Sequence, residues 1–257
     1  EEGNVLPDKK WVTQLVQPGS SLGGARPKAS VIDTDKTLYV AKFPSRKDDY
    51  DAGLWEHFSH LLATKAGVNV AKTKVLATGE KYHTLLSQRF DRTNDSKRIH
   101  FASAMTLLGL SDGDNATTGY GYLDIVDFII QNCTDVERNL QELFRRVAFN
   151  ICIGNSDDHF RNHGFLLTAK GWKLSPAYDM NPTLNEYQSL LISADSNKAD
   201  LSILLDACED YMLNRNTAEK IISEVIEVVK EWRGLAVRQG ITKREIDMFS
   251  GVLDGAM

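Results

Sequence analysis

Acidic, amide and imidazole side chains are concentrated between residues 154 and 164, in the stretch Gly-Asn-Ser-Asp-Asp-His-Phe-Arg-Asn-His-Gly. Asp157 precedes Asn162 by five positions, and Asp179 follows in the sequence Ser-Pro-Ala-Tyr-Asp. This order of side chains is typical of a phosphoryl-transfer site. One Asp accepts the proton of an attacking hydroxyl, while the Asn and the second Asp hold Mg²⁺ against the nucleotide phosphates. Such hard oxygen ligands suit Mg²⁺.

The segments around this stretch predict how its side chains are positioned. Apolar residues between Leu140 and Ile151 recur at helical spacing, which predicts a buried helix before it. Residues 165–167 and 172–174 read as two short strands joined by a turn that ends at Gly171. Because a hairpin brings its two flanks together, we expect Asp179 to lie beside Asn162.

Two other interpretations of the stretch remain open at this point. Asp, Asn, His and Gly are ordinary turn residues, so a polar loop after a helix is one of them. A metal hydrolase is the other, with four candidate ligands, Asp157, Asp158, His159 and His163. Its two histidines would have to share one helix face, whereas Gly164 and the strand after it favour a loop.

Composition limits the class of protein. The 257 residues are 42% hydrophobic and 25% charged, which is typical of a globular chain with one large or two smaller domains. A net charge of -5 argues against direct contact with DNA or RNA. No apolar run or leader predicts a membrane span or a secretory signal. Cys133, Cys152 and Cys208 fit neither a metal site nor a disulfide framework, which favours the reducing cytoplasm.

Two features near the start of the chain could bind phosphate. Residues 18–31 form a loop rich in Gly, Ser and Pro, in which small residues let backbone N–H groups approach an anion and Arg26 and Lys28 add positive charge. Residues 38–44 then read as a strand that carries Lys42. A strand lysine after a glycine loop holds the α- and β-phosphates in protein kinases. Alone, each also fits a plain loop or an edge-strand lysine.

The remaining elements change from strands to helices near residue 91. Residues 51–66 predict a helix with Asp51 as its N-cap and Gly67 after its end, and Glu56 on this helix could pair with Lys42. Residues 70–77 and 82–90 predict paired strands, followed by a connector like the one that binds adenine in kinases. Residues 112–121 predict a loop, and helices are expected at 123–132, 136–153, 218–232 and 242–253, the last with a Thr-to-Glu capping box.

This order of parts resembles the HipA family of bacterial serine/threonine kinases, the toxins of type II toxin–antitoxin pairs. The resemblance extends from about residue 18 to the end of the chain. It rests on five segments: Ser-Leu-Gly-Gly-Ala-Arg-Pro-Lys at 21–28, Ala-Lys-Phe-Pro at 41–44, Gln-Arg-Phe-Asp-Arg at 88–92, Asp-Asp-His-Phe-Arg-Asn-His-Gly-Phe at 157–165 and Leu-Ser-Pro-Ala-Tyr-Asp at 174–179.

The resemblance implies an α+β, two-lobed protein-kinase-like fold, with a small β-rich N-lobe over residues 1–90 and a mostly helical C-lobe over 91–257. It implies that Asp157 is the catalytic residue, that Asn162 and Asp179 bind Mg²⁺, and that Ser21, with Ser20 beside it, is autophosphorylated. The ATP contacts that it implies are Gly23, Gly24, Ala25, Arg26, Pro27, Lys28, Lys42, Gln88, Arg89, Phe90, His159, Phe160, Arg161, Asn162, Tyr178 and Asp179.

The family also implies partners. Its substrates include aminoacyl-tRNA synthetases, whose modification stalls translation, and a small helix-turn-helix antitoxin carries the DNA binding, so contact with DNA would be indirect. Longer members have a small N-terminal subdomain that is almost absent here; it is either a separate polypeptide or has been cut away. Asp158 stands where Gly is common, so either adjacent carboxylate could be the base, and alignment favours Asp157.

Two rival functions are kept beside the kinase. A small-molecule kinase of the aminoglycoside phosphotransferase type also uses an Asp, an Asn and a second Asp. A pseudokinase that only binds in an antitoxin–DNA complex is the rival from another class. Loss of a key residue is the usual sign of a pseudokinase, whereas Lys42, Asp157, Asn162 and Asp179 are all present here.

Overall fold

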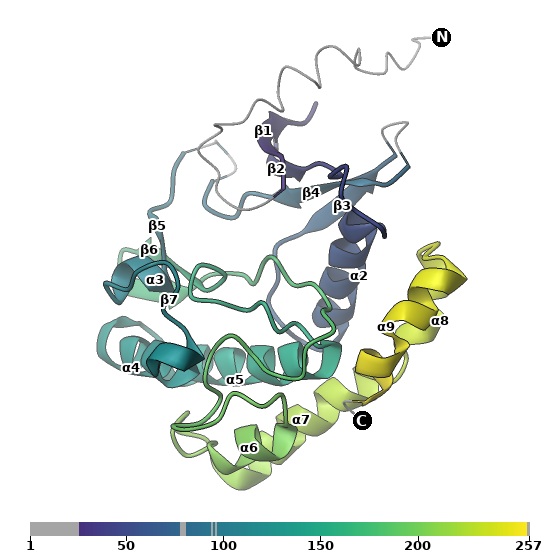
Figure 1. The fold of residues 1–257 in the computed structure, drawn as a ribbon. Coiled ribbons are helices and arrows are strands. Elements are labelled where there is room, and N and C mark those ends of the chain that lie inside the picture. Colours follow the sequence, from purple (N-terminus) through teal and green to yellow (C-terminus); the bar gives the residue numbers. More distant parts are fainter. Residues whose placement is uncertain (1–25, 78–80, 94, 96, 256–257) are drawn as a thin grey trace.

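The computed structural model describes residues 26–77, 81–93, 95 and 97–255. Figure 1 shows a small sheet with one helix above a larger, mainly helical part. The strands are β1 Lys28–Ile32, β2 Leu38–Lys42, β3 Thr73–Leu76, β4 Thr84–Gln88, β5 Phe101–Ser103, β6 Gly164–Thr168 and β7 Gly171–Leu174. The helices are α2 Ala52–Lys65, α3 Ala104–Leu107, the short 3₁₀ helix η1 Ala116–Thr118, α4 Tyr122–Asn132, α5 Val136–Ile153, α6 Leu201–Asp206, α7 Arg215–Val229, α8 Trp232–Arg238 and α9 Lys243–Gly255.

The smaller lobe is an antiparallel sheet with the strand order β1-β2-β4-β3, packed against α2. The predicted N-cap of α2 is confirmed, because the Asp51 carboxylate accepts the Leu54 N–H at 3.0 Å. The glycine-rich segment was expected to remain a loop to residue 31, but it is a strand from Lys28. The run Ala-Ser-Val-Ile is compatible with a strand, and β2 supplies an antiparallel partner for all five of its residues.

The larger lobe is built around α5, whose apolar face is fully buried, as in Leu143, Phe144 and Val147. Helices α4 and α7 pack along α5, and the small sheet β5-β6-β7 lies against α4 and α5 through β7. The hairpin of β6 and β7 confirms the expected pair of strands after the polar stretch. The short segment β5 was not foreseen; it pairs with the other edge of β6.

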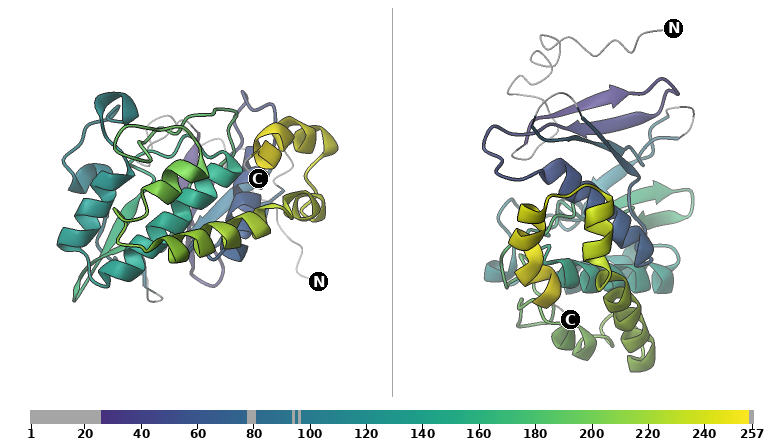
Figure 2. Two further views of the ribbon diagram at one scale, coloured as in Figure 1. Left: turned by 90° about the horizontal axis from the view of Figure 1, so that it is seen from below. Right: turned by 90° about the vertical axis from the view of Figure 1, so that its right-hand side faces the viewer.

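Helices α8 and α9 close over the outer side of α2, as both views in Figure 2 show. Trp55 of α2 has its ring centroid 4.5 Å from that of Phe249 of α9 and 6.5 Å from that of Trp232 of α8. Glu245, at the start of α9, accepts the backbone N–H of Asp51 at 2.7 Å. The C-terminal helices therefore fix α2 both through aromatic packing and at its N-terminus.

Most element boundaries agree with the sequence pattern, and the differences have local causes. The expected helix 218–232 begins earlier, as α7, because Asn214 caps it through a 2.9 Å hydrogen bond to the Thr217 N–H. It ends at Val229, so that Trp232 begins the separate helix α8. The capping box of α9 is confirmed, with Thr242 and Glu245 bonded reciprocally at 3.2 and 3.3 Å.

None of the helices in the described part of the chain combines the length and the apolar character that crossing a membrane requires.

Candidate active site

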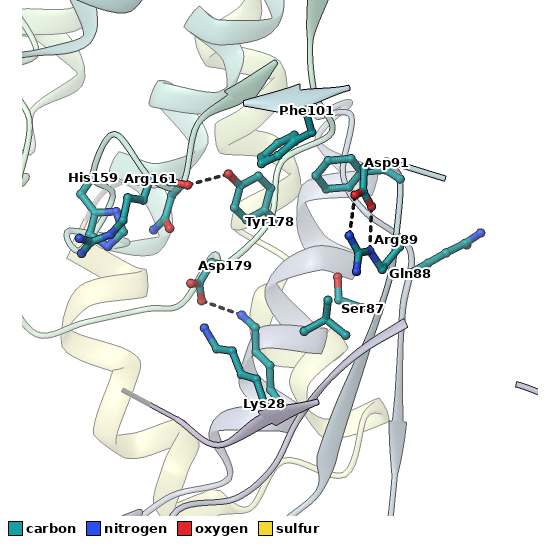
Figure 3. Close-up of a pocket in the computed structure, with 14 residues that line it drawn as sticks. Lys28, Ser87, Gln88, Arg89, Asp91, Phe101, His159, Arg161, Tyr178 and Asp179 are labelled. Carbon is teal, nitrogen blue, oxygen red and sulfur yellow. Dashed lines mark hydrogen bonds and ion pairs between the residues drawn. The ribbon is translucent and has the colours of Figure 1, made fainter. Parts of the chain in front are cut away.

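Two adjoining cavities, of about 360 and 410 Å³, lie between the lobes and share one set of polar residues. Residues common to both are Lys28, Lys42, His159, Arg161, Asn162 and Asp179. They therefore form one cleft with two ends, and Figure 3 shows Lys28 and Asp179 facing each other across it. Eleven of the predicted ATP contacts line this cleft, namely the six shared residues together with Arg26, Gln88, Arg89, Phe90 and Tyr178.

One end of the cleft is apolar and aromatic. The ring centroid of Phe90 lies 5.7 Å from that of Phe101 and 5.6 Å from that of Tyr178. The Tyr178 hydroxyl donates to the Arg161 carbonyl at 2.6 Å, which fixes its ring at the mouth of the pocket (Figure 3). Among the residues that the structure describes, none accepts a hydrogen bond from the Phe90 N–H. This end thus offers flat apolar faces and a backbone donor, which suit a purine base.

Lys42 lies at the centre of the cleft, between two carboxylates. Its ammonium group is 2.6 Å from Glu56 and 2.8 Å from Asp179, so the expected pair with Glu56 is confirmed. Burial alone would lower the pKa of Lys42, but the two carboxylates outweigh it and raise the pKa to about 12. Burial likewise would raise the pKa of Asp179, yet Lys42 and then Lys28 lower it to about 2. Both side chains are therefore charged at neutral pH.

A second cation stands beside Lys42. Lys28 of β1 is the direct cross-strand partner of Lys42 of β2, and both line the cleft. Burial and the charge of Lys42 lower the pKa of Lys28. Arg26 also lines the cleft, and its guanidinium nitrogen is 2.6 Å from a carboxylate oxygen of Asp48. Gly23, Gly24, Ala25, Ser20 and Ser21 lie outside the described residues, and Pro27 is not part of the cleft lining.

The other end of the cleft carries the oxygen ligands. Asp157 is exposed there, and the Asn162 amide nitrogen donates to the Asp157 carbonyl at 3.2 Å. That bond leaves the side-chain oxygen of Asn162 available as a metal ligand. Asp179 adopts a left-handed backbone conformation, with φ of 58°, which is costly for a residue other than Gly and is concentrated at functional sites. An ionised carboxylate and an amide oxygen fit Mg²⁺, which takes few protein ligands.

Asp158, the second of the adjacent carboxylates, is only 3% exposed and points away from the cleft. One of its oxygens accepts a hydrogen bond from His163, whose side chain is fully buried. Asp158 and His163 are thus occupied with each other inside the protein. Among the described residues there is no cluster of three His, Cys, Asp or Glu side chains that could hold a metal. The four ligands of the metal-hydrolase interpretation are therefore not brought together in the described part of the chain.

One predicted ATP contact is not supported by its position. Phe160 is 2% exposed, packs its ring edge-on against Tyr120 in the core, and does not line either cavity. In its loop it alternates with His159 and Arg161, which do line the cleft. The role of Phe160 is to anchor the loop rather than to contact a nucleotide.

Sequence reasoning also missed parts of the site. Phe101 belongs to a three-residue strand, Val40 to the middle of β2, and Asn155 and Asn181 to the loops on either side of the cleft. For Val40 a signal was available, because it is two positions before Lys42 and so shares its face of the strand. No pattern in the sequence marks Phe101, whose place depends on the pairing of β5 with β6.

The chain is similar to several known proteins. A family model described as the HipA-like C-terminal domain matches residues 20–232. The serine/threonine-protein kinase toxin HipA of Shewanella oneidensis is 26% identical over 190 residues, which is 64% of this chain and 43% of that protein. A putative kinase of Haemophilus influenzae is 26% identical over 181 residues, 63% of this chain and 52% of that protein. The chain thus spans about half of the length of these curated relatives.

Solved structures show the same fold. HipA of Shewanella oneidensis, in a complex with HipB and operator DNA, superposes with a TM-score of 0.75 at 17% identity, covering 99% of this chain and 72% of that one. The Helicobacter pylori proinflammatory kinase CtkA gives a TM-score of 0.53 at 14% identity, covering 87% of this chain and 95% of that one. The expected two-lobed α+β fold is confirmed.

Proposed function

The chain belongs to the HipA-like C-terminal domain family, and from this premise we propose that it is an ATP- and Mg²⁺-dependent kinase that phosphorylates serine or threonine hydroxyls of a protein. The observation that carries the proposal is the position of Lys42. It is bonded to Glu56 of α2 and to Asp179 in a cleft that Asp157 and Asn162 also line. Lysine, glutamate and aspartate in this arrangement are the parts that an active kinase has to assemble.

Different residues along the cleft would bind different parts of ATP. The aromatic end around Phe90, Phe101 and Tyr178 would take the adenine, with the Phe90 N–H as a donor to the base. Lys42 and Lys28 would hold the phosphates, since two cations side by side on neighbouring strands complement a polyphosphate.

Chemistry would take place at the opposite end. Asp157, exposed at the cleft, would accept the proton of the attacking hydroxyl and direct its oxygen in line with the terminal phosphate. Asn162 and Asp179 would hold Mg²⁺, which supplies positive charge to the transferring phosphoryl group. Since Asp179 is already ionised and Asn162 is already oriented, little rearrangement is needed to complete the site.

The test is the change Asp157→Asn, which preserves the shape of the side chain but removes the base. We expect ATP binding measured by calorimetry to persist, and phosphoryl transfer to fall by about 10²–10⁴-fold. The control is Asp127→Asn, an exposed carboxylate on α4. A phosphoproteomic comparison of cells that express each variant would detect the products. Wild-type phosphorylation in the Asp157→Asn cells would show that this residue is not the base.

The substrate and partners are a further part of the proposal. We infer that the protein acts in the cytoplasm as a toxin, that an aminoacyl-tRNA synthetase is its target, and that a helix-turn-helix antitoxin binds it. The net charge of -5 supports an arrangement in which the antitoxin contacts the DNA. A separate small protein resembling the N-terminal subdomain of longer relatives is a second proposed partner. Transfer to a small alcohol, with no phosphoprotein formed, would instead indicate the aminoglycoside-type kinase.

Autophosphorylation on Ser21 or Ser20 is proposed as the self-inhibiting step, although both serines lie outside the described residues. A phosphoserine there adds about −1.5 to −2 charges and would compete with the ATP phosphates for Lys28. After incubation with ATP and Mg²⁺, mass spectrometry should find phosphate on this loop in the wild type and none in Asp157→Asn. A Ser20→Asp, Ser21→Asp variant that binds ATP as tightly as the wild type would exclude self-inhibition.

A further inference from the structure

The buried carboxylate of Asp158 is the centre of a hydrogen-bond network that the proposed reaction does not use directly. Three side chains donate to the same Asp158 oxygen, each at 2.8 Å: the Tyr122 hydroxyl, the Asn150 amide and the His163 imidazole Nε2. They come from α4, from α5 and from the residue before β6. One oxygen atom therefore ties together three separate elements.

The network reaches the proposed catalytic base and the first metal ligand along the chain. Asp157 directly precedes Asp158, and Asn162 directly precedes His163. The bond between Asp158 and His163 closes a loop that contains Asn162 and that Asp157 directly precedes. Inside this loop the Asn162 amide donates to the Asp157 carbonyl at 3.2 Å. Asp157, which is exposed, and Asn162, which is largely buried, are thus each adjacent to a residue fixed by the network.

The network reaches the second metal ligand through space. Asn155 donates to the Asn150 side chain at 3.1 Å, and the Asn155 oxygen accepts the Asn181 backbone N–H at 3.4 Å. The Asn181 amide in turn lies 3.4 Å from the Asp179 carboxylate. Each step is a direct contact between side chains or with the backbone. A path of hydrogen bonds therefore runs from Asp158, through Asn150, to Asp179, which contacts Lys42 and is a proposed Mg²⁺ ligand.

The charge of Asp158 is consistent with this role. Burial would raise its pKa, but His163, Tyr122 and Arg146 outweigh that and lower it. An ionised carboxylate accepts strong hydrogen bonds and donates none, so all three donors have to orient toward it. Buried charged groups contribute little to net stability compared with apolar packing, and their clearest use is to specify one arrangement of their neighbours.

We propose that Asp158 is a positioning residue that sets Asp157, Asn162 and Asp179 in register for phosphoryl transfer without touching ATP or the substrate. This inference rests on the proposed kinase function. It also assigns different roles to the two adjacent carboxylates: Asp157 accepts the proton of the substrate hydroxyl, and Asp158 fixes the positions of its neighbours.

Paired substitutions test the assignment. Asp158→Ala leaves three buried donors without an acceptor, so kcat should fall by about 10–100-fold and the affinity for Mg²⁺ should weaken, with the KM for ATP nearly unchanged. Asp158→Asn keeps an oxygen in the same place and should lower kcat by less than about tenfold. In Asp157→Asn, by contrast, an equally conservative change removes the base and should lower transfer by about 10²–10⁴-fold.

A milder variant guards against failure of Asp158→Ala to fold. Tyr122→Phe removes one donor and keeps the ring, whereas the matched control Tyr211→Phe removes a buried hydroxyl that has no hydrogen-bond partner among the described residues. We expect Tyr122→Phe to lower kcat and to speed hydrogen exchange of the amides in residues 157–163. Tyr211→Phe should do neither.

Three outcomes are decisive. Equal kcat and equal exchange in the two Tyr→Phe variants would overturn the inference, as would a folded Asp158→Ala protein with wild-type kcat. If the wild type transfers no phosphoryl group to any protein, the proposed function fails and the catalytic role of Asp158 fails with it. Faster exchange of residues 157–163 in that case would still show that the network orders the loop, so the two failures are distinguishable.

Discussion

Replacing Lys42 by Met removes the ammonium group that lies between the carboxylates of Glu56 and Asp179. The Lys42 and Glu56 side chains are 12% and 5% exposed, so water cannot take the place of the lost partner. Loss of one member of a buried ion pair costs about 3–5 kcal/mol. We therefore expect the free energy of unfolding of Lys42→Met to fall by about that amount at neutral pH.

The size of this loss should depend on pH, with a predictable sign. Burial raises the pKa of Glu56, Lys42 lowers it, Asp179 raises it and Lys28 lowers it. The variant loses the larger of the two lowering influences, so the pKa of Glu56 should rise further. A carboxyl with a pKa raised in the folded state stabilises the protein below its unfolded pKa, and this stability is lost as pH rises through the folded pKa. Between the ordinary value of 4.5 and the raised pKa of the folded variant, the free energy of unfolding should fall by up to about 1.4 kcal/mol per pH unit.

Urea unfolding followed by tryptophan fluorescence, at pH values between about 5 and 8, measures both quantities. The control Lys230→Met breaks an exposed pair with Glu227 and should cost less than about 1 kcal/mol at every pH. Adding Glu56→Leu to Lys42→Met should remove the pH dependence. A destabilisation that is the same at all pH values, or one that persists unchanged in the double variant, would refute the reasoning.

Three further changes test other parts of the site. Gly164→Ala places a Cβ 2.2 Å from the Phe101 ring, so the ring should shift into the proposed adenine pocket. We expect the ATP affinity measured by calorimetry to weaken by about tenfold. An unchanged affinity would argue against that pocket. Asp179→Ala should abolish transfer and the Mg²⁺ dependence of ATP binding, and the assignment fails if wild-type affinity is equal with and without Mg²⁺. Trp55→Ala should lower the free energy of unfolding by about 3–5 kcal/mol, whereas Val237→Ala, an exposed change on α8, should have little effect.

The kinase-like order of parts could be predicted from the sequence because each part has its own local signal. A polar stretch between a helix and a hairpin placed Asp157 and Asn162 before one strand and Asp179 after the next. The pairing of Lys42 with Glu56 was recognised as possible from a strand lysine followed by a helix glutamate, and the structure shows the pair. These inferences needed only periodicity, turn residues and the geometry of a hairpin.

What sequence reasoning missed depends on tertiary contacts. Nothing in the pair Asp157-Asp158 indicates which carboxylate faces outward, because a loop has no repeating period. The answer lies in Tyr122 and Asn150, on two helices whose packing brings their donors to one oxygen. In the same way, most of β1 was taken for a loop because the turn-rich segment before it hid the five residues that pair with β2.

The packing of α8 and α9 on α2 has a consequence for the order in which the protein is made. Helix α2 leaves the ribosome about 170 residues before the helices that hold it. At roughly 5–20 residues per second this is a delay of roughly 10–30 s. During that interval Trp55 has no partner in Trp232 or Phe249, and the N-terminus of α2 lacks the Glu245 carboxylate. The Lys42–Glu56 pair therefore lacks the packing that holds α2 in place until α9 has been synthesised.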